Sequence, residues 1–189
     1  PALVGLAMGI YGLTQAVLQL PLGMASDRLG RKRIIVAGLL VFAAGSLLAA
    51  LAGSVTGLVV GRAVQGAGAV SAAVTALLAD QTRDVVRTKA MALVGASIGL
   101  MFATALVAAP PLAALVGLPG LFGLTCALAL AGIAIVLWVV PTEPALHADA
   151  PRGRLADVWR HADLLRLNAG VFVLHTVQMA MWEAVPAML

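Results

Sequence analysis

Six long apolar stretches constrain this chain more than any other feature of its sequence. They cover roughly Pro1–Leu22, Ile34–Ala52, Gly57–Ala79, Ala90–Val116, Pro119–Val140 and Leu167–Leu189. A helix needs about 20 apolar residues to cross the hydrocarbon core of a bilayer, so each stretch is long enough to span it. The stretches are continuously apolar, whereas the strands of a membrane barrel alternate at period two and are about half as long. The sequence therefore predicts an all-α membrane protein with six transmembrane helices.

The composition agrees with this fold class and argues against others. Of the 189 residues, 62% are hydrophobic and only 11% are charged, whereas an ordinary soluble domain has about 25% charged residues. The net charge of +4 comes without a basic stripe interleaved with aromatic residues, so we expect no nucleic-acid partner. Cys126 is the single cysteine, which excludes an intrachain disulfide. The chain starts at Pro1 without a recognisable signal peptide, and we expect it to be a piece of a longer chain.

Positive charge is confined to alternate connections between the predicted spans. Eleven of the twelve Lys and Arg residues lie in 23–33, 80–89 and 141–166. The connections near 53–56 and 117–118 carry none. Cytoplasmic loops of membrane proteins carry an excess of Lys and Arg, so we expect the three charged loops to be cytoplasmic. The first span would then run from the outside to the inside.

The last charged loop differs in composition from the other two. Its first part, PTEPALHADAPRG, is rich in Pro, Ala and charge and is typical of a linker. In RLADVWRHADLLR the apolar residues fall on one helical face, which predicts a short helix on the membrane surface or a soluble linker helix. We therefore expect an N-terminal bundle over 1–140, a cytoplasmic linker with an amphipathic helix over 141–166, and the first helix of a C-terminal bundle over 167–189.

The first charged loop, GMASDRLGRKR, combines its bases with two glycines and an acid at defined positions. One helix later the sequence reads GRAVQGAG, which contains the only basic residue inside any predicted span. These patterns resemble the loop-2–3 signature (motif A) and the helix-4 signature (motif B) of the major facilitator superfamily. The matching positions are Gly23, Asp27, Arg28, Gly30, Arg31 and Arg33 for motif A, and Arg62, Gln65 and Gly66 for motif B.

The resemblance covers essentially the whole chain and is closest to the bacterial drug:proton antiporter group. It implies a partial major facilitator fold made of family helices 2 to 7, with helix 1 and helices 8 to 12 missing. It also implies proton-coupled efflux of drugs or small molecules by alternating access, with a proton gradient and no cofactor as the energy source. The implied location is the bacterial inner membrane. The implied partners are the lipid bilayer, a small-molecule substrate, protons and the missing helices of the full-length chain.

Two other functions remain open. Gly95, Gly99 and Pro110 fit part of the glycine motif that antiporters of the family carry on helix 5 (motif C), and the two glycines would allow close helix packing. Several other glycines of that motif are alanines here, so a metabolite uptake symporter of the same fold is an alternative. A structural membrane subunit without transport is an alternative from another class. We expect no enzyme and no metal site, because the sequence contains no HExxH, CxxC or GxSxG pattern.

The resemblance also implies roles for the motif residues. The motif A loop would act as an inner latch that holds the outward-open state. The alternative is a loop that only fixes the topology and binds anionic lipid. Asp27 could accept from backbone N–H groups at the N-terminus of a neighbouring helix, where the helix dipole favours an anion. Arg62 would bind anionic groups in the cavity or modulate a coupled proton. The alternative for Arg62 is a side chain that reaches the outer headgroups.

Two polar stripes at helical spacing are further candidates for the substrate cavity. They consist of Tyr11, Gln15 and Gln19 in the first span, and His175, Gln178, Trp182 and Glu183 in the last. Glutamines facing lipid are unfavourable, so the first stripe should meet the cavity or form hydrogen bonds between helices. A histidine can exchange protons near neutral pH, or it can be packed and neutral. The glutamate could pair with Arg62 or lie at the headgroups.

Overall fold

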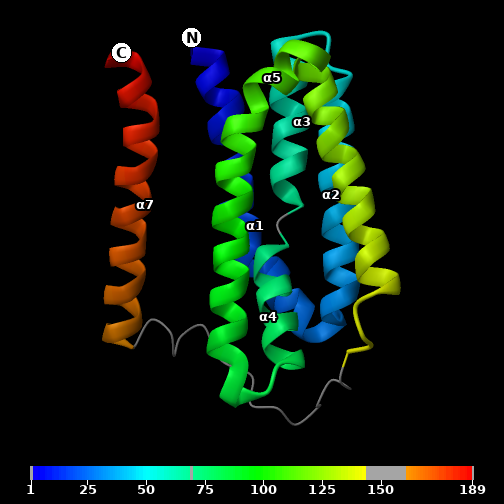
Figure 1. Ribbon diagram of the computed structural model, residues 1–189, viewed down its shortest axis with the longest axis vertical. Helices are drawn as coiled ribbons and strands as arrows, with labels where there is room; N and C mark the ends of the chain where they lie inside the picture. The colour runs from blue at the N-terminus through cyan, green and yellow to red at the C-terminus, as the bar shows by residue number, and fades with distance from the viewer. Residues whose placement is uncertain (1, 69, 144–160, 189) are drawn as a thin grey trace. The chain divides into compact units, whose positions relative to one another are not determined.

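The structure, a computed structural model, describes residues 2–68, 70–143 and 161–188, with side chains for all of these except 2–4, 8, 179 and 182–188. The described residues form helices joined by short connections, and no strand occurs among them. The helices are α1 (Ala2–Leu29), α2 (Arg31–Ala50), α3 (Val55–Ala67), α4 (Ser71–Gln81), α5 (Asp84–Trp138) and α7 (Ala162–Met188) (Figure 1). The chain divides into two units, residues 1–146 and 147–189, and each is described by itself.

Helices lie over all six predicted spans, so the predicted all-α fold is confirmed. Three stretches of the described residues are long and apolar enough to cross a membrane by length and composition: α2, the segment Val55–Gln81 that contains α3 and α4, and α5. α5 contains two of the predicted spans, because its backbone leaves helical geometry at Gly117 and the chain turns back there (Figure 1). α1 and α7 cover the predicted first and last spans.

Both of the short uncharged connections form turns. Gly117 has φ 68° and ψ 177°, a conformation that residues with a Cβ rarely adopt, and Pro119 follows it. At the other connection, Ser54 is the N-cap of α3, and its Oγ accepts a hydrogen bond from the Gly57 N–H at 3.1 Å. A serine at this position satisfies one of the backbone donors that a helix N-terminus leaves without a partner.

Small residues bring the helices of the first unit close together. α2 contacts α1, α3, α4 and α5. A methyl group added to Gly45 of α2 would overlap the backbone of Gln65 in α3, and one added to Gly61 would lie 2.6 Å from the backbone nitrogen of Ala49. A methyl group on Gly66 would overlap the carbonyl oxygen of Tyr11 in α1. Small residues allow such close packing in a bilayer, where burial of apolar surface does not favour helix association.

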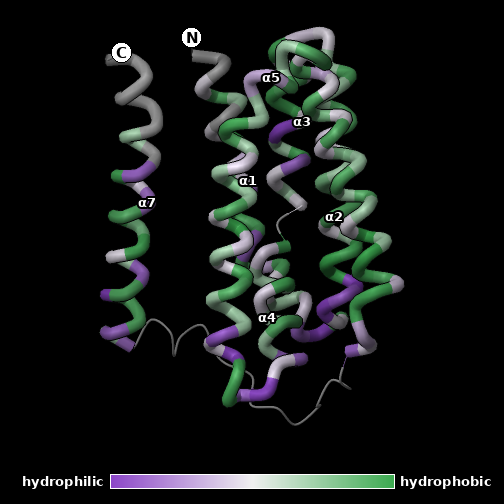
Figure 2. The backbone as a smooth tube through the Cα atoms, in the orientation of Figure 1, coloured by the Kyte–Doolittle hydropathy of each residue, from purple (hydrophilic) through white to green (hydrophobic). Residues whose placement is uncertain are grey.

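One end of the first unit is charged, as the purple segments in Figure 2 show. We call it the charged end and define it as residues 27–33, 80–89 and 141–143. Next to it lies a buried apolar cluster of Ile34, Ile35, Ala73 and Leu77, against which residues of α1 and α5 pack. This cluster fixes the ends of α1, α2, α4 and α5 relative to one another.

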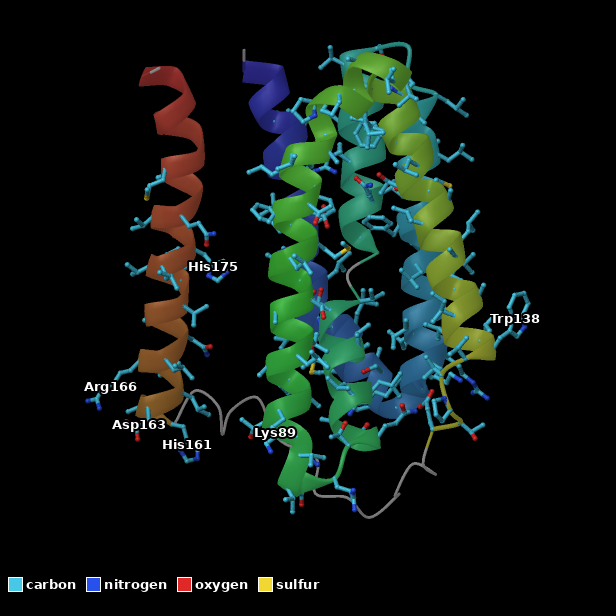
Figure 3. All side chains as sticks on the ribbon, in the orientation of Figure 1. Lys89, Trp138, His161, Asp163, Arg166 and His175 are labelled. Atoms are coloured by element: carbon cyan, nitrogen blue, oxygen red, sulfur yellow. The ribbon has the colours of Figure 1, made fainter. Side chains whose placement is uncertain are left out.

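The second unit is described through α7, which begins at Ala162 instead of at the predicted Leu167. Asp163 lies in the first turn of α7, where the positive end of the helix dipole favours an acid. Its Oδ1 lies 3.3 Å from the Nη1 of Arg166 (Figure 3). Most of the predicted linker and of its amphipathic helix lies in 144–160, outside the described residues.

Candidate functional site

Arg31, the first residue of α2, connects three helices at the charged end. Its guanidinium pairs with Asp27 of α1 and lies 3.1 Å, from Nε to Oδ2, from Asp80 of α4. Its Nη1 also donates to the Ser26 Oγ at 2.8 Å. A planar guanidinium with five N–H donors can serve several acceptors at once, which an ammonium group on a flexible chain does less well. The side chain is only 17% exposed, so these contacts are partly shielded from water.

The glycine that opens motif A lies where α1 meets α4. A methyl group on Gly23 would lie 3.3 Å from the Cβ of Ala72, which is a tight contact. The Gly23 carbonyl accepts a hydrogen bond from the fully buried Ser26 hydroxyl at 2.6 Å. Because Ser26 also accepts from Arg31, it joins the α1 backbone to the guanidinium. Neither Ser26 nor Asp80 is marked by the sequence motifs as part of this site.

The second motif A glycine shapes the turn between α1 and α2. Gly30 has φ 101° and ψ 139° and is the N-cap of α2, where it offers no side-chain acceptor. Glu143 supplies the acceptors instead: one carboxylate oxygen accepts from the Arg31 N–H at 2.8 Å, and the other accepts from the Lys32 N–H. The first N–H groups of a helix have no acceptor within the helix, and the helix dipole favours an anion there.

The remaining motif A bases are placed differently. Arg28 and Arg33 are exposed, and neither forms an ion pair within the part of the chain that the structure describes. Asp27 pairs with Arg31. A contact of Asp27 with the N-terminus of a neighbouring helix stays a prediction.

Arg62 of motif B is held by neutral groups from two helices. Its Nε donates to the Ala7 carbonyl oxygen at 3.4 Å, and its Nη1 donates to the Gln65 side-chain oxygen. The guanidinium carbon lies 4.3 Å from the centroid of the Tyr11 ring, within the range of a cation–π interaction. No carboxylate among the described side chains lies within ion-pair distance of Arg62.

Gln65 extends these contacts into α2. Its side chain is 2% exposed, and its Nε2 donates to the Ser46 Oγ at 2.8 Å. The Ser46 hydroxyl in turn donates to the Phe42 carbonyl at 2.8 Å. A buried amide needs partners for both its oxygen and its nitrogen, and here it has them. The motif B residues thus form a continuous polar chain from α1 through α3 to α2.

The predicted cavity stripes are only partly joined to this site. Tyr11 contacts Arg62, whereas Gln15 and Gln19 are half-buried, and the Gln19 Oε1 accepts no hydrogen bond from a described residue. On α7, Gln178 and His175 are exposed, and the His175 Nδ1 lies 3.0 Å from a carbonyl of its own helix (Figure 3). The side chains of Trp182 and Glu183 lie outside the described residues.

The helix-5 glycines are open on the surface of the first unit. A methyl group on Gly95 or Gly99 would meet no atom within 4 Å. The backbone of α5 stays helical through Pro110 and departs from helical geometry at Gly117. Close packing at these glycines therefore stays a prediction. Among the described residues, no group of three or more His, Cys, Asp or Glu side chains could hold a metal ion.

Comparisons with known proteins identify relatives of this chain. The family model described as "Major Facilitator Superfamily" matches residues 1–188. The chain is 48% identical over 192 residues to "Inner membrane transport protein YajR" of Escherichia coli, which covers 100% of this chain and 42% of that protein. It is 42% identical over 141 residues to an "Uncharacterized transporter" of Buchnera aphidicola, which covers 75% of this chain and 36% of that protein.

A shorter match is 43% identical over 61 residues to "Multidrug resistance protein D" of Escherichia coli and covers 32% of this chain and 16% of that protein. The chain spans less than half the length of these relatives. The apolar helices and the family match together make it a multi-pass membrane protein of a transporter family, which is not a family of enzymes. From its motif geometry and the match over nearly its whole length, the chain belongs to the Major Facilitator Superfamily.

Proposed function

We propose that this chain is part of a secondary transporter that exports small molecules, drugs among them, in exchange for protons across the bacterial inner membrane. The observation that carries the proposal is the environment of Arg62, a cation in an apolar helix that is held by one backbone carbonyl, a side-chain amide and an aromatic ring. A charge inside a membrane helix is costly and marks a substrate or ion pathway by default.

The neutral partners of Arg62 suit proton coupling. Its described contacts orient the guanidinium without cancelling its charge. A carboxylate that enters its field, on a substrate or on another helix, is stabilised in the ionised form, and protonation of that carboxylate removes the attraction. The attraction between Arg62 and such a carboxylate can therefore be switched by the arrival of a proton, which is what an exchanger requires.

We propose that the charged end is the inner latch of this transporter and faces the cytoplasm. Its excess of Lys and Arg supports that orientation. Arg31 and Asp27 would bind the other bundle when the protein is outward-open and release it when the bundles rock. Residues 1–140 would belong to one bundle and 167–189 to the next, with His175, Gln178, Trp182 and Glu183 lining the cavity between them.

Replacement of Arg62 in the full-length transporter tests this function. In inverted membrane vesicles we expect Arg62→Ala to abolish substrate uptake driven by an imposed pH gradient. Arg62→Lys keeps the charge but not the fork of donors, and it should retain part of the coupling. Arg166→Ala removes an exposed arginine and serves as the control. An unchanged response of Arg62→Ala to the pH gradient would refute the proposal.

A symporter that takes up a metabolite is the second candidate. It is favoured by the alanines that replace several motif C glycines around Gly95 and Gly99. Counterflow measured with inward and outward proton gradients distinguishes the two. An exchanger moves its substrate in the direction opposite to the protons. A symporter moves its substrate in the same direction as the protons.

A further inference from the structure

The segment 140–143, which follows α5, is bound to the charged end at three places. The Glu143 carboxylate accepts from the backbone N–H groups of Arg31 and Lys32. The Lys32 Nζ donates to the Val140 carbonyl at 2.7 Å, and the Gln81 Nε2 donates to the Pro141 carbonyl at 3.1 Å. These partners come from α2 and α4, so two helices hold the place where the connection between the bundles begins.

The N-terminus of α2 depends on Glu143 for its acceptors. Arg31 and Lys32 are the first two residues of the helix, and their N–H groups have no acceptor within it. The N-cap residue, Gly30, has no side chain that could accept. A carboxylate that takes both N–H groups forms charge-assisted hydrogen bonds and stabilises the positive end of the helix dipole.

Gly30 contributes its backbone conformation to this contact. A methyl group at Gly30 would lie 3.5 Å from one Glu143 oxygen and 3.7 Å from the other, at ordinary van der Waals distance. The space around Gly30 therefore does not require a glycine, whereas its φ of 101° is a conformation that residues with a Cβ rarely adopt. The second motif A glycine thus provides the turn after which the first N–H groups of α2 meet an acid that lies more than a hundred residues later.

We propose that Glu143 is a positioning residue that ties the connection between the two bundles to the motif A loop. Arg31 joins the two systems, because its N–H binds Glu143 while its side chain binds Asp27 and Asp80. A change at the latch is then passed directly to the start of the connection at Glu143. This inference rests on the proposed function insofar as the latch changes partners during transport.

Glu143 acts far from the motif B site. Arg31 and Ser46 are both in α2, fifteen residues apart, which corresponds to about 22 Å along the helix at 1.5 Å per residue. Loss of Glu143 should therefore slow the conformational change without altering the substrate site. In transport measurements this appears as a lower maximal rate with an unchanged KM.

Hydrogen–deuterium exchange of the full-length protein in lipid nanodiscs tests the positioning directly. We expect peptides that contain Arg31 and Lys32 to exchange about tenfold faster in Glu143→Ala, because these N–H groups lose the acceptors that they have among the described residues. Glu143→Gln keeps one acceptor but no charge, so its exchange rate should lie between those of the wild type and Glu143→Ala. Thr142→Ala, at an exposed neighbour, should match the wild type. Wild-type exchange in both Glu143 variants would overturn the proposal.

Transport by the same preparations in proteoliposomes tests the consequence. We expect Glu143→Gln to lower the maximal rate at least threefold and to leave the KM within twofold. Asp163→Asn removes one exposed negative charge outside the charged end, and it should transport at the wild-type rate. Faster exchange with a wild-type maximal rate in Glu143→Gln would refute the role in transport.

The two measurements keep the two claims apart. A wild-type protein that transports nothing under either proton gradient would contradict the proposed function, while exchange at Arg31 and Lys32 would still decide the anchoring by Glu143. A wild-type protein that transports normally, with exchange unaffected in Glu143→Ala, would contradict only the anchoring.

Discussion

The guanidinium of Arg62 lies over the ring of Tyr11, with 4.3 Å between its central carbon and the ring centroid. The two residues come from α3 and α1, so this contact joins the motif B helix to the first span. The predicted polar stripe of α1 therefore has a partner at one of its three positions. The ring also provides an attractive surface for a cation that has no described carboxylate nearby.

Replacing Tyr11 should show whether the ring or the hydroxyl matters. Tyr11→Phe keeps the face of the ring, and we expect transport and thermal stability close to the wild type. Tyr11→Ala should cost about 0.5–2 kcal/mol, the range for a cation–π contact, and should lower the apparent melting temperature in detergent. Equal losses in both variants would show that the hydroxyl is the important group.

Gln65 is predicted to be more sensitive than its neighbour Ser46. In Gln65→Leu, Arg62 loses an acceptor and the Ser46 hydroxyl loses a donor, and unsatisfied buried groups cost about 1–3 kcal/mol each. Ser46→Ala removes one neutral hydrogen bond and should cost only about 1 kcal/mol. SDS-induced unfolding of the purified full-length protein measures both. A smaller loss for Gln65→Leu than for Ser46→Ala would contradict the described network.

Two glycine-to-alanine substitutions form a matched pair. In Gly45→Ala the added methyl group would lie 2.6 Å from the Gln65 Cα, so α2 and α3 must move apart, at a cost of about 1–3 kcal/mol. In Gly95→Ala the methyl group meets nothing within 4 Å of the described structure, so stability should be unchanged or slightly raised through helix propensity. SDS-induced unfolding compares the two variants. A greater loss for Gly95→Ala would show that motif C is tightly packed in the full-length transporter.

Arg31 should not be replaceable by lysine. An ammonium group cannot serve Asp27, Asp80 and Ser26 together, so Arg31→Lys should reduce the transport rate at least several-fold although the charge is kept. Arg33→Lys, at an exposed arginine without a described ion pair, should transport like the wild type. Initial rates in proteoliposomes measure both. Equal rates for the two variants would show that only the charge of the loop matters.

How much of this could be predicted from the sequence depends on how local each feature is. The spans follow from apolar run length, and the turn at Gly117 follows from an uncharged Gly-Leu-Pro between two such runs. The end of α3 at Ala67 was not predicted, because it lies within one continuous apolar stretch. Glycines have low helix propensity. A methyl group on Gly68 would lie 2.5 Å from the Gly38 carbonyl oxygen, so this glycine allows close packing of the end of α3 against α2.

The long-range contacts of the site could not be predicted. Motif A and motif B mark Arg31 and Arg62 through spacing alone, but their partners Asp80 and Tyr11 come from other helices. The stretch around Glu143 is rich in Pro, Ala and charge, which predicts only a linker. One signal did point to it: a helix that begins after a glycine needs an acceptor from elsewhere, and Glu143 is the acid just past the end of α5.

The turn at Gly117 has a consequence for how this membrane protein is made. Gly117 and Leu118 carry no charge, so passing the turn through the hydrocarbon avoids the roughly 2.5–3.5 kcal/mol that a charged side chain adds at the middle of a bilayer. The two halves of α5 can therefore enter the membrane together as one hairpin. Both of its polar ends, near Asp84 and beyond Trp138, then stay on the same side of the membrane.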